Sequence, residues 1–196
     1  VMKSEKISFP NHRGEQLAAL LDLPEDETPI AYALFAHCFT CTKSFKAAAN
    51  IAAALNREKV AVFRFDFTGL GQSEGDFADT NFSTNVADLV AAAAYMAKEL
   101  AAPQIIIGHS LGGAAVLQAA KDIDSLRAVV TIAAPYDPGH VARHFAAKHD
   151  QIEREGAAEV NLSGRPFKIK KQFLADLEMQ QPDDHIRALN KALLVM

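Results

Sequence analysis

The residue best placed to do chemistry is the serine in Gly108-His109-Ser110-Leu111-Gly112. This Gly-x-Ser-x-Gly run follows a short β-branched apolar segment and precedes an alanine-rich segment at 114–120, so a strand, a sharp turn and a helix are expected. The glycines lack Cβ atoms, which lets strand and helix pass close to the serine. We therefore predict that Ser110 is the nucleophile of an acyl transfer. The amide N–H of Leu111, at the helix start, would be one donor to the oxyanion.

A second candidate chemistry belongs to Cys38-Phe39-Thr40-Cys41, a C-x-x-C between a predicted strand and a predicted helix. A helix N-terminus favours the thiolate, so Cys38 and Cys41 could form a redox pair. The flanking sequence is not thioredoxin-like, and a structural role in the loop is the other interpretation. Two cysteines are too few for the disulfide framework of a secreted protein, which indicates a reducing cytoplasm.

Strand and helix patterns alternate along the chain before these motifs and between them. A hairpin is expected from 6–10 and 17–23, buried apolar strands at 30–36, 60–67 and 126–134, and helices at 44–59 and 81–100. Apolar strands that alternate with helices predict a doubly wound, mostly parallel α/β sheet with helices on both faces.

The alternation is interrupted at about 139–190. A charged helix over 141–155, a hairpin over 160–170 around Ser163-Gly164 and two short helices are expected there, and 192–196 then begins another buried strand. Such an insertion lies above the strand ends, where ligands bind in open α/β sheets. We predict one domain with a core of 1–138 and 191–196 and a lid that contacts the substrate. A passive covering layer is the alternative.

Composition limits the classes of partner. The 196 residues suit one domain, and 49% hydrophobic with 22% charged residues is typical of soluble globular proteins. A net charge of −4 gives no indication of nucleic acid or an anionic membrane as partner. The sequence has no apolar run long enough to span a bilayer and no apolar stretch of the signal-peptide type near its start, so a cytoplasmic location is expected. No metal or organic cofactor is indicated.

Three stretches resemble the α/β-hydrolase superfamily. They are the run 108–113, the strand that ends in His37, and the loop Asp66-Phe67-Thr68-Gly69-Leu70-Gly71-Gln72-Ser73. The resemblance implies that the amide N–H of Phe39 is the second oxyanion donor. More narrowly, the run 37–43 is similar to a hydrolase module fused to an OsmC-like redox domain, which implies a fused or associated OsmC-like partner.

The sequence also departs from the superfamily pattern. Cysteine stands at position 38, where glycine is usual, and a positive φ there would strain it. In this fold the order is serine, acid, histidine. The resemblance places acid and base beyond Met196, so the chain is expected to be C-terminally truncated. The later histidines, at 140, 144, 149 and 185, are not expected to act as the base. Asp137 is interpreted as a turn residue before Pro138.

These observations predict a carboxylesterase-like serine hydrolase that acts on a small ester or acyl substrate. Two alternatives remain: a thiol redox protein using Cys38 and Cys41, and a non-catalytic hydrolase-like binding scaffold. His37 and His109 are expected to be structural. The sequence specifies neither the substrate nor the oligomeric state.

Overall fold

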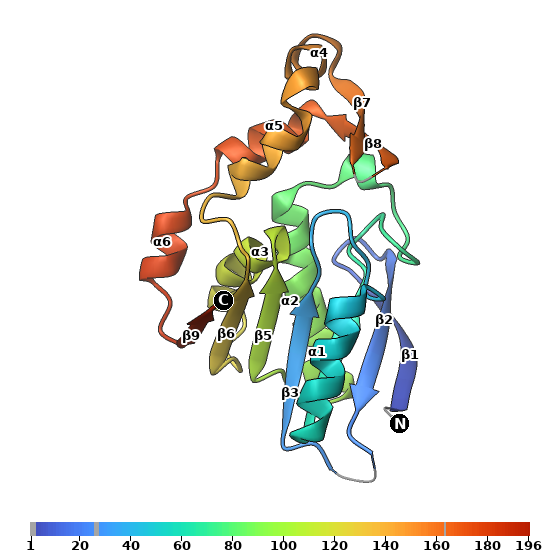
Figure 1. Ribbon diagram of the computed structural model, residues 1–196, viewed down its shortest axis with the longest axis vertical. Coiled ribbons are helices and arrows are strands. Elements are labelled where there is room, and N and C mark those ends of the chain that lie inside the picture. Colours follow the sequence, from blue (N-terminus) through green and yellow to red (C-terminus); the bar gives the residue numbers. More distant parts are fainter. Residues whose placement is uncertain (1–2, 26–27, 163) are drawn as a thin grey trace.

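The computed structural model describes residues 3–25, 28–162 and 164–196. Within these residues, seven strands form one sheet in the order β1-β2-β4-β3-β5-β6-β9 (Figure 1). The strands are β1 (Lys3–Pro10), β2 (Gln16–Leu23), β3 (Ala31–Ala36), β4 (Val60–Phe65), β5 (Ile105–His109), β6 (Ala128–Ile132) and β9 (Ala192–Val195). The first two form the expected antiparallel hairpin, β2 pairs antiparallel with β4, and the pairs from β4 to β9 are parallel. The predicted mostly parallel sheet is confirmed.

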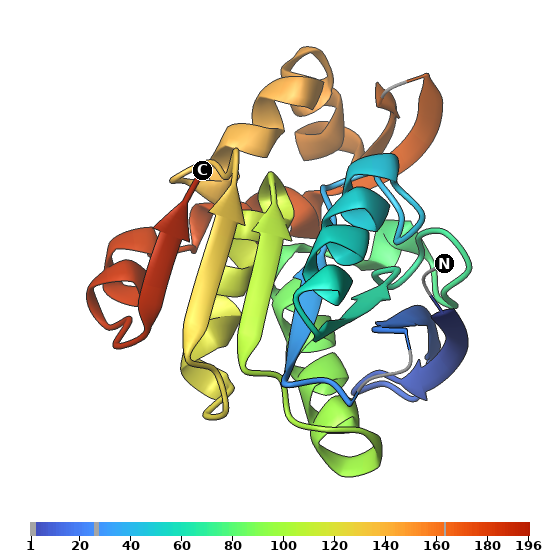
Figure 2. The same ribbon diagram turned by 60° about the horizontal axis from the view of Figure 1, so that its bottom comes forward.

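Helices cover both faces of this sheet, as expected. Helix α1 (Lys46–Arg57) lies on one face, and α2 (Phe82–Glu99) and α3 (Leu111–Ala119) lie on the other (Figures 1 and 2). Alternate residues of β3 face the two helix layers. Ala33 and Phe35 belong to the apolar cluster under α1, and Leu34 belongs to the cluster under α2 and α3. Because the central strands are buried on both faces, their sequences read as continuous apolar runs.

The segment from 138 to 187 lies above the carboxyl ends of the parallel strands, and we call it the cap segment (Figure 1). It contains the 3₁₀ helix η3 (Pro138–Lys148), α4 (His149–Glu155), the hairpin β7 (Ala157–Leu162) and β8 (Arg165–Lys170), α5 (Lys171–Glu178) and α6 (Pro182–Arg187). The short 3₁₀ helices η1 (Phe77–Asp79) and η2 (Ala120–Asp122) lie outside it. The hairpin and both short helices are confirmed, whereas Ser163 lies outside the described residues.

The single helix expected over 141–155 is wrong. A 3₁₀ segment precedes a short α-helix, and Phe145 between them has a non-helical φ of −131°. Phe145 is buried, and its ring lies 6.1 Å from that of Phe173 in α5. Contacts with the rest of the cap segment thus outweigh the local preference for a continuous helix.

The expectation that 192–196 forms a buried strand is also wrong for the described residues. Strand β9 pairs with β6 at the edge of the sheet, and its last three side chains, Leu193, Leu194 and Val195, are 44%, 53% and 71% exposed. None of the helices in the described part of the chain is long and apolar enough to cross a membrane.

Candidate active site

Ser110 occupies the turn between β5 and α3 with φ +54° and ψ −125°. Non-glycine residues seldom adopt a positive φ, because Cβ approaches the backbone. The neighbouring strand fixes this turn, since the Ser110 N–H donates to the carbonyl of Ile132 at 2.9 Å. The Gly113 N–H donates back to the carbonyl of Ser110 at 2.8 Å and starts the helix. The strained strand–turn–helix geometry expected from the sequence is therefore present.

The two glycines of the motif are required by close backbone approach. A Cβ at Gly108 would lie 2.3 Å from the carbonyl oxygen of Gly112. A Cβ at Gly112 would lie 2.3 Å from the carbonyl oxygen of His37, at the end of β3. The start of α3 thus lies directly against the loop that follows β3.

Ser110 opens onto a cavity of about 620 Å³. Its wall combines the turn, the end of β6 and the start of the cap segment, and it consists of Ser110, Leu111, Ala133, Ala134, Pro135, Tyr136, Asp137, Gly139, His140, Val141, Arg143 and His144. Ala133, like Ser110, has a positive φ, at +48°. Two strained residues on one cavity wall fit a functional site, where such strain concentrates.

Part of this wall was predicted from the sequence. Ser110 and Leu111 were selected, and the segment 139–190 was predicted to be a lid that contacts the substrate, but no individual side chain of that segment was named for this contact; Arg143 is one on the wall. Phe39, the other expected oxyanion donor, is not among the lining residues. Its ring packs 5.5 Å from Phe77 and 5.3 Å from Phe173.

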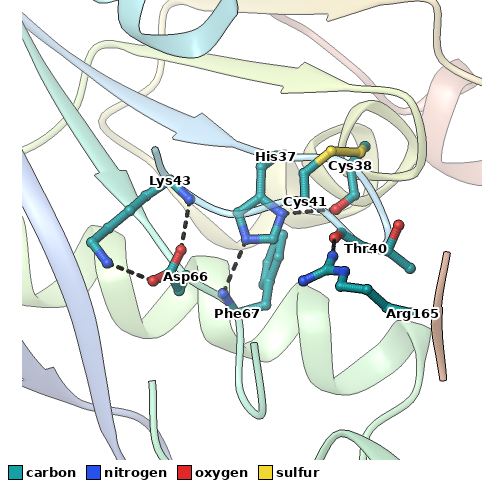
Figure 3. Close-up of a disulfide and its surroundings, with 8 residues drawn as sticks. All are labelled: His37, Cys38, Thr40, Cys41, Lys43, Asp66, Phe67 and Arg165. Carbon is teal, nitrogen blue, oxygen red and sulfur yellow. Dashed lines mark hydrogen bonds and ion pairs between the residues drawn. A yellow bond between two sulfur atoms is a disulfide. The ribbon is translucent and has the colours of Figure 1, made fainter. Parts of the chain in front are cut away.

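His37 is completely buried between two backbone groups (Figure 3). Its Nδ1 lies 2.7 Å from the carbonyl oxygen of Cys38, and its Nε2 accepts from the Phe67 N–H at 3.3 Å. These bonds fit a neutral ring with its proton on Nδ1. Burial lowers the pKa of His37 to about 4, although the bond to Cys38 and the charge of Asp66 oppose the shift. Such a ring holds the loop in place, in agreement with the structural role expected for it.

Cys38 and Cys41 form a disulfide with their Cα atoms 5.2 Å apart (Figure 3). In this state neither sulfur is a thiolate, so the predicted low-pKa thiol does not apply to it. Among the described non-glycine residues a positive φ occurs only at Lys59, Ser110 and Ala133, so the backbone strain considered for Cys38 is absent. A redox role for this pair stays a prediction.

The loop 66–73 contacts the loop 37–43, which contains the disulfide, through the carboxylate of Asp66. The Asp66 carboxylate accepts from the backbone N–H of Lys43 at 2.6 Å and from that of Gln72 at 2.9 Å. It also forms a buried ion pair with Lys43 Nζ at 2.5 Å. A Cβ at Gly71 would lie 2.2 Å from a carboxylate oxygen of Asp66. The motif therefore joins two loops and does not contribute to the cavity wall.

The structure also places the histidines and the aspartate that were not expected to act in catalysis. His109 stacks on Phe45 with ring centroids 5.4 Å apart, and burial lowers its pKa, which agrees with a structural role. Asp137 accepts from the Gly139 N–H at 2.7 Å and caps η3, as its position before proline predicted. His140 and His144 line the cavity, whereas His149 and His185 do not. The described residues contain no cluster of three side chains suited to hold a metal.

Comparisons with known proteins agree with the fold. A sequence model of the alpha/beta hydrolase family matches residues 33–194. The structure is similar to the esterase domain of a Rhodothermus marinus protein, with 44% identity, TM-score 0.73, and coverage of 99% of this chain and 75% of that chain. Est1E from Butyrivibrio proteoclasticus with bound ferulic acid has 24% identity, TM-score 0.76, and coverage of 96% and 77%. Mouse alpha/beta hydrolase domain-containing protein 10 has 19% identity, TM-score 0.71, and coverage of 97% and 88%. The last two likenesses concern the fold alone. A search of curated proteins finds no match.

Proposed function

Because the chain belongs to the α/β-hydrolase family, we propose that it is a serine esterase whose nucleophile is Ser110. The observation that carries this proposal is the strained turn of Ser110 at the wall of a cavity. The serine stands at the N-terminus of α3, where the helix dipole favours negative charge. A binding scaffold would have no need of a strained serine at this point.

The proposed reaction begins when the Ser110 Oγ attacks the ester carbonyl carbon and its proton passes to a base. The carbonyl oxygen becomes an oxyanion, which the Leu111 N–H and, on the other side, the Phe39 N–H would stabilise. Collapse of this intermediate expels the alcohol and leaves an acyl-serine, which water then hydrolyses.

We propose that the acid and the base come from sequence outside residues 1–196. Supporting this, the chain covers 75% of the Rhodothermus marinus esterase domain, so that relative contains further residues. His140 and His144 line the cavity, but both are exposed residues of a 3₁₀ segment with no orienting carboxylate among their described hydrogen bonds. A base in a triad needs such a partner.

The proposed substrate is a small ester. The cavity of about 620 Å³ falls within the usual range for small-molecule sites, roughly 300–1,000 Å³. Part of its wall belongs to the cap segment, which supports the proposal that this segment is a lid that contacts the substrate. Carboxylesterase specificity is part of the same proposal.

A fluorophosphonate probe and p-nitrophenyl acetate test the function on the protein with its complete natural sequence. We expect one probe adduct by intact mass, and we expect Ser110→Ala to abolish both the adduct and hydrolysis. Ser125→Ala is the matched control, because the Ser125 hydroxyl bonds to the carbonyl of Pro103, outside the cavity wall. No adduct on folded protein, or hydrolysis unchanged in Ser110→Ala, would contradict the proposal and favour the scaffold.

Two finer predictions accompany this proposal. The similarity of the run 37–43 to OsmC-fused modules predicts an OsmC-like partner, which sequencing of the complete gene or co-purification would reveal. A cytoplasmic location, predicted from the sequence, can be checked by cell fractionation.

A further inference from the structure

The loop from 37 to 43 is fixed at both ends. At one end both ring nitrogens of His37 are engaged with backbone groups, as described above. At the other end Lys43 is buried, with its ammonium on Asp66. The carbonyl of Lys43 also accepts from the guanidinium of Arg64, which in turn pairs with Asp22 at 2.6 Å. The ends of the loop are therefore held by the core and do not depend on the sulfurs.

The disulfide closes the middle of the loop. Cys38 and Cys41 close a ring around Phe39 and Thr40, and the Cys41 N–H donates to the Cys38 carbonyl at 3.2 Å. The four residues 38–41 are partly exposed, so the loop lies at the surface, where small thiols can approach it. In Figure 3 the disulfide and the Lys43–Asp66 pair lie on opposite sides of His37.

The same ring contacts the cap segment. The Thr40 carbonyl accepts from the guanidinium of Arg165 in β8 (Figure 3). The Phe39 ring packs against Phe173 of α5. A change in the shape of the ring would therefore reach both the Phe39 amide and the cap segment above the cavity.

We propose that the Cys38–Cys41 disulfide is a redox-modification site at which small dithiols switch the hydrolase to a slower form. The inference rests on the proposed function, because its effect passes through the amide of Phe39 as oxyanion donor. The disulfide is the covalent link that holds positions 38 and 41 together. Opening it leaves the Phe39 ring on Phe77 and Phe173 and the Thr40 carbonyl on Arg165, but it lets the backbone between Cys38 and Cys41 shift, and the donor loses its alignment. The amide of Phe39 is thus the donor, and the disulfide positions it.

The chemistry is thiol–disulfide exchange with a dithiol as reductant. A thiolate of the dithiol attacks one sulfur, the Cys38–Cys41 bond breaks, and a mixed disulfide forms. The second thiol of the reductant then displaces the protein sulfur. The protein gains two electrons and two protons as two thiols, and the reductant becomes a cyclic disulfide. Oxidised glutathione, itself a disulfide, supplies the reverse reaction.

The test compares hydrolysis of p-nitrophenyl acetate by the same complete protein before reduction and after reduction with dithiothreitol, which is removed by gel filtration before the assay because free thiols cleave this ester. We expect kcat to fall about 5- to 50-fold on reduction, less than the roughly 10²–10³-fold cost of removing an oxyanion donor outright. KM should change less than twofold, because the donor acts mainly in the transition state. Reoxidation should restore the rate. Alkylation with iodoacetamide followed by mass measurement should show two labelled cysteines in the reduced form and none in the oxidised form.

The variant Cys38→Ser/Cys41→Ser is the matched control. It should have the kcat of the reduced protein and should not respond to dithiothreitol, while its circular dichroism spectrum and thermal midpoint show that it is folded at the assay temperature. If the variant does not fold, the reduced wild-type protein gives the same comparison.

Two outcomes would overturn the inference. One is Ser110-dependent hydrolysis with equal kcat in both redox states, which leaves the proposed function intact. The other is failure of the purified protein to form the disulfide with oxidised glutathione. Absence of Ser110-dependent hydrolysis in both states would instead contradict the proposed function, and the labelling experiment would still report on the disulfide.

Discussion

Gly112 passes the carbonyl oxygen of His37 so closely that a Cβ at position 112 would stand 2.3 Å from that oxygen. This approach joins the start of α3, which carries Ser110, to the loop after β3. Backbone lies on both sides of the contact, so neither partner can rotate away. The geometry of the candidate site therefore depends on a residue without a side chain.

We expect Gly112→Ala to destabilise the protein by roughly 3 kcal/mol, the upper end of overpacking, and to lower kcat/KM at least about 100-fold. Urea denaturation and ester hydrolysis measure the two effects. Gly14→Ala is the control: Gly14 has φ +83° but nothing within 4 Å of an added Cβ. It should cost about 1 kcal/mol and leave kcat unchanged. Equal losses in the two variants would contradict the steric explanation.

A variant with alanine is usually more stable than one with glycine at the same position. The positive φ of Ser110 predicts the reverse order at this position. Both Ser110→Ala and Ser110→Gly lack the hydroxyl, and both should be inactive. Glycine accepts φ +54° without a Cβ clash, whereas alanine retains the strain. We expect Ser110→Gly to have the higher thermal midpoint, with a difference of about 1 kcal/mol in the free energy of unfolding. A more stable alanine variant would show that the turn is not strained.

Burial of His37 predicts a loss of stability in acid. Its pKa is about 4 in the folded protein against 6.5 for the unperturbed side chain, so between these values the unfolded state binds more protons. The contribution is fully present above pH 6.5 and is lost as the pH falls towards 4. At about 1.4 kcal/mol for each pKa unit, the loss reaches about 3 kcal/mol.

Urea denaturation at pH 7.5, 5.5 and 4.5 measures this effect. His37→Gln is the control, because glutamine offers one donor and one acceptor but does not titrate. The difference between the two proteins should shrink as the pH falls. A difference that does not vary with pH would mean that the pKa of His37 is the same in the folded and the unfolded protein.

Asp176 of α5 ties the cap segment to the start of α2. Its buried carboxylate accepts from the Ser83 N–H at 2.9 Å and from the Ser83 hydroxyl at 2.5 Å. We expect Asp176→Ala to cost about 1–2 kcal/mol, as loss of a helix cap does. Hydrogen exchange should increase in the cap segment and not in the central strands, and KM should rise. Asp150→Ala, which removes an exposed carboxylate of α4, should change neither.

The sequence by itself determined the elements whose causes are local. The spacing of glycines around Ser110 predicted the turn, and Gly108 and Gly112 are needed where the motif placed them. Continuous apolar runs predicted the central strands, because a strand covered on both faces must be apolar throughout. The N-terminus of α2 was also readable, since Asn81 and Thr84 form a capping box within four residues.

Only the tertiary structure decided how these elements meet. The kink at Phe145, the exposed edge strand β9 and the contact between Arg165 and the loop of Cys38 each depend on residues far apart in the chain. The same holds for the cavity wall, to which η3 contributes Arg143 and His144. A sequence pattern records which side chains are apolar and where the chain can turn. It does not record which distant backbone a given residue will touch, because that depends on the packing of all layers together.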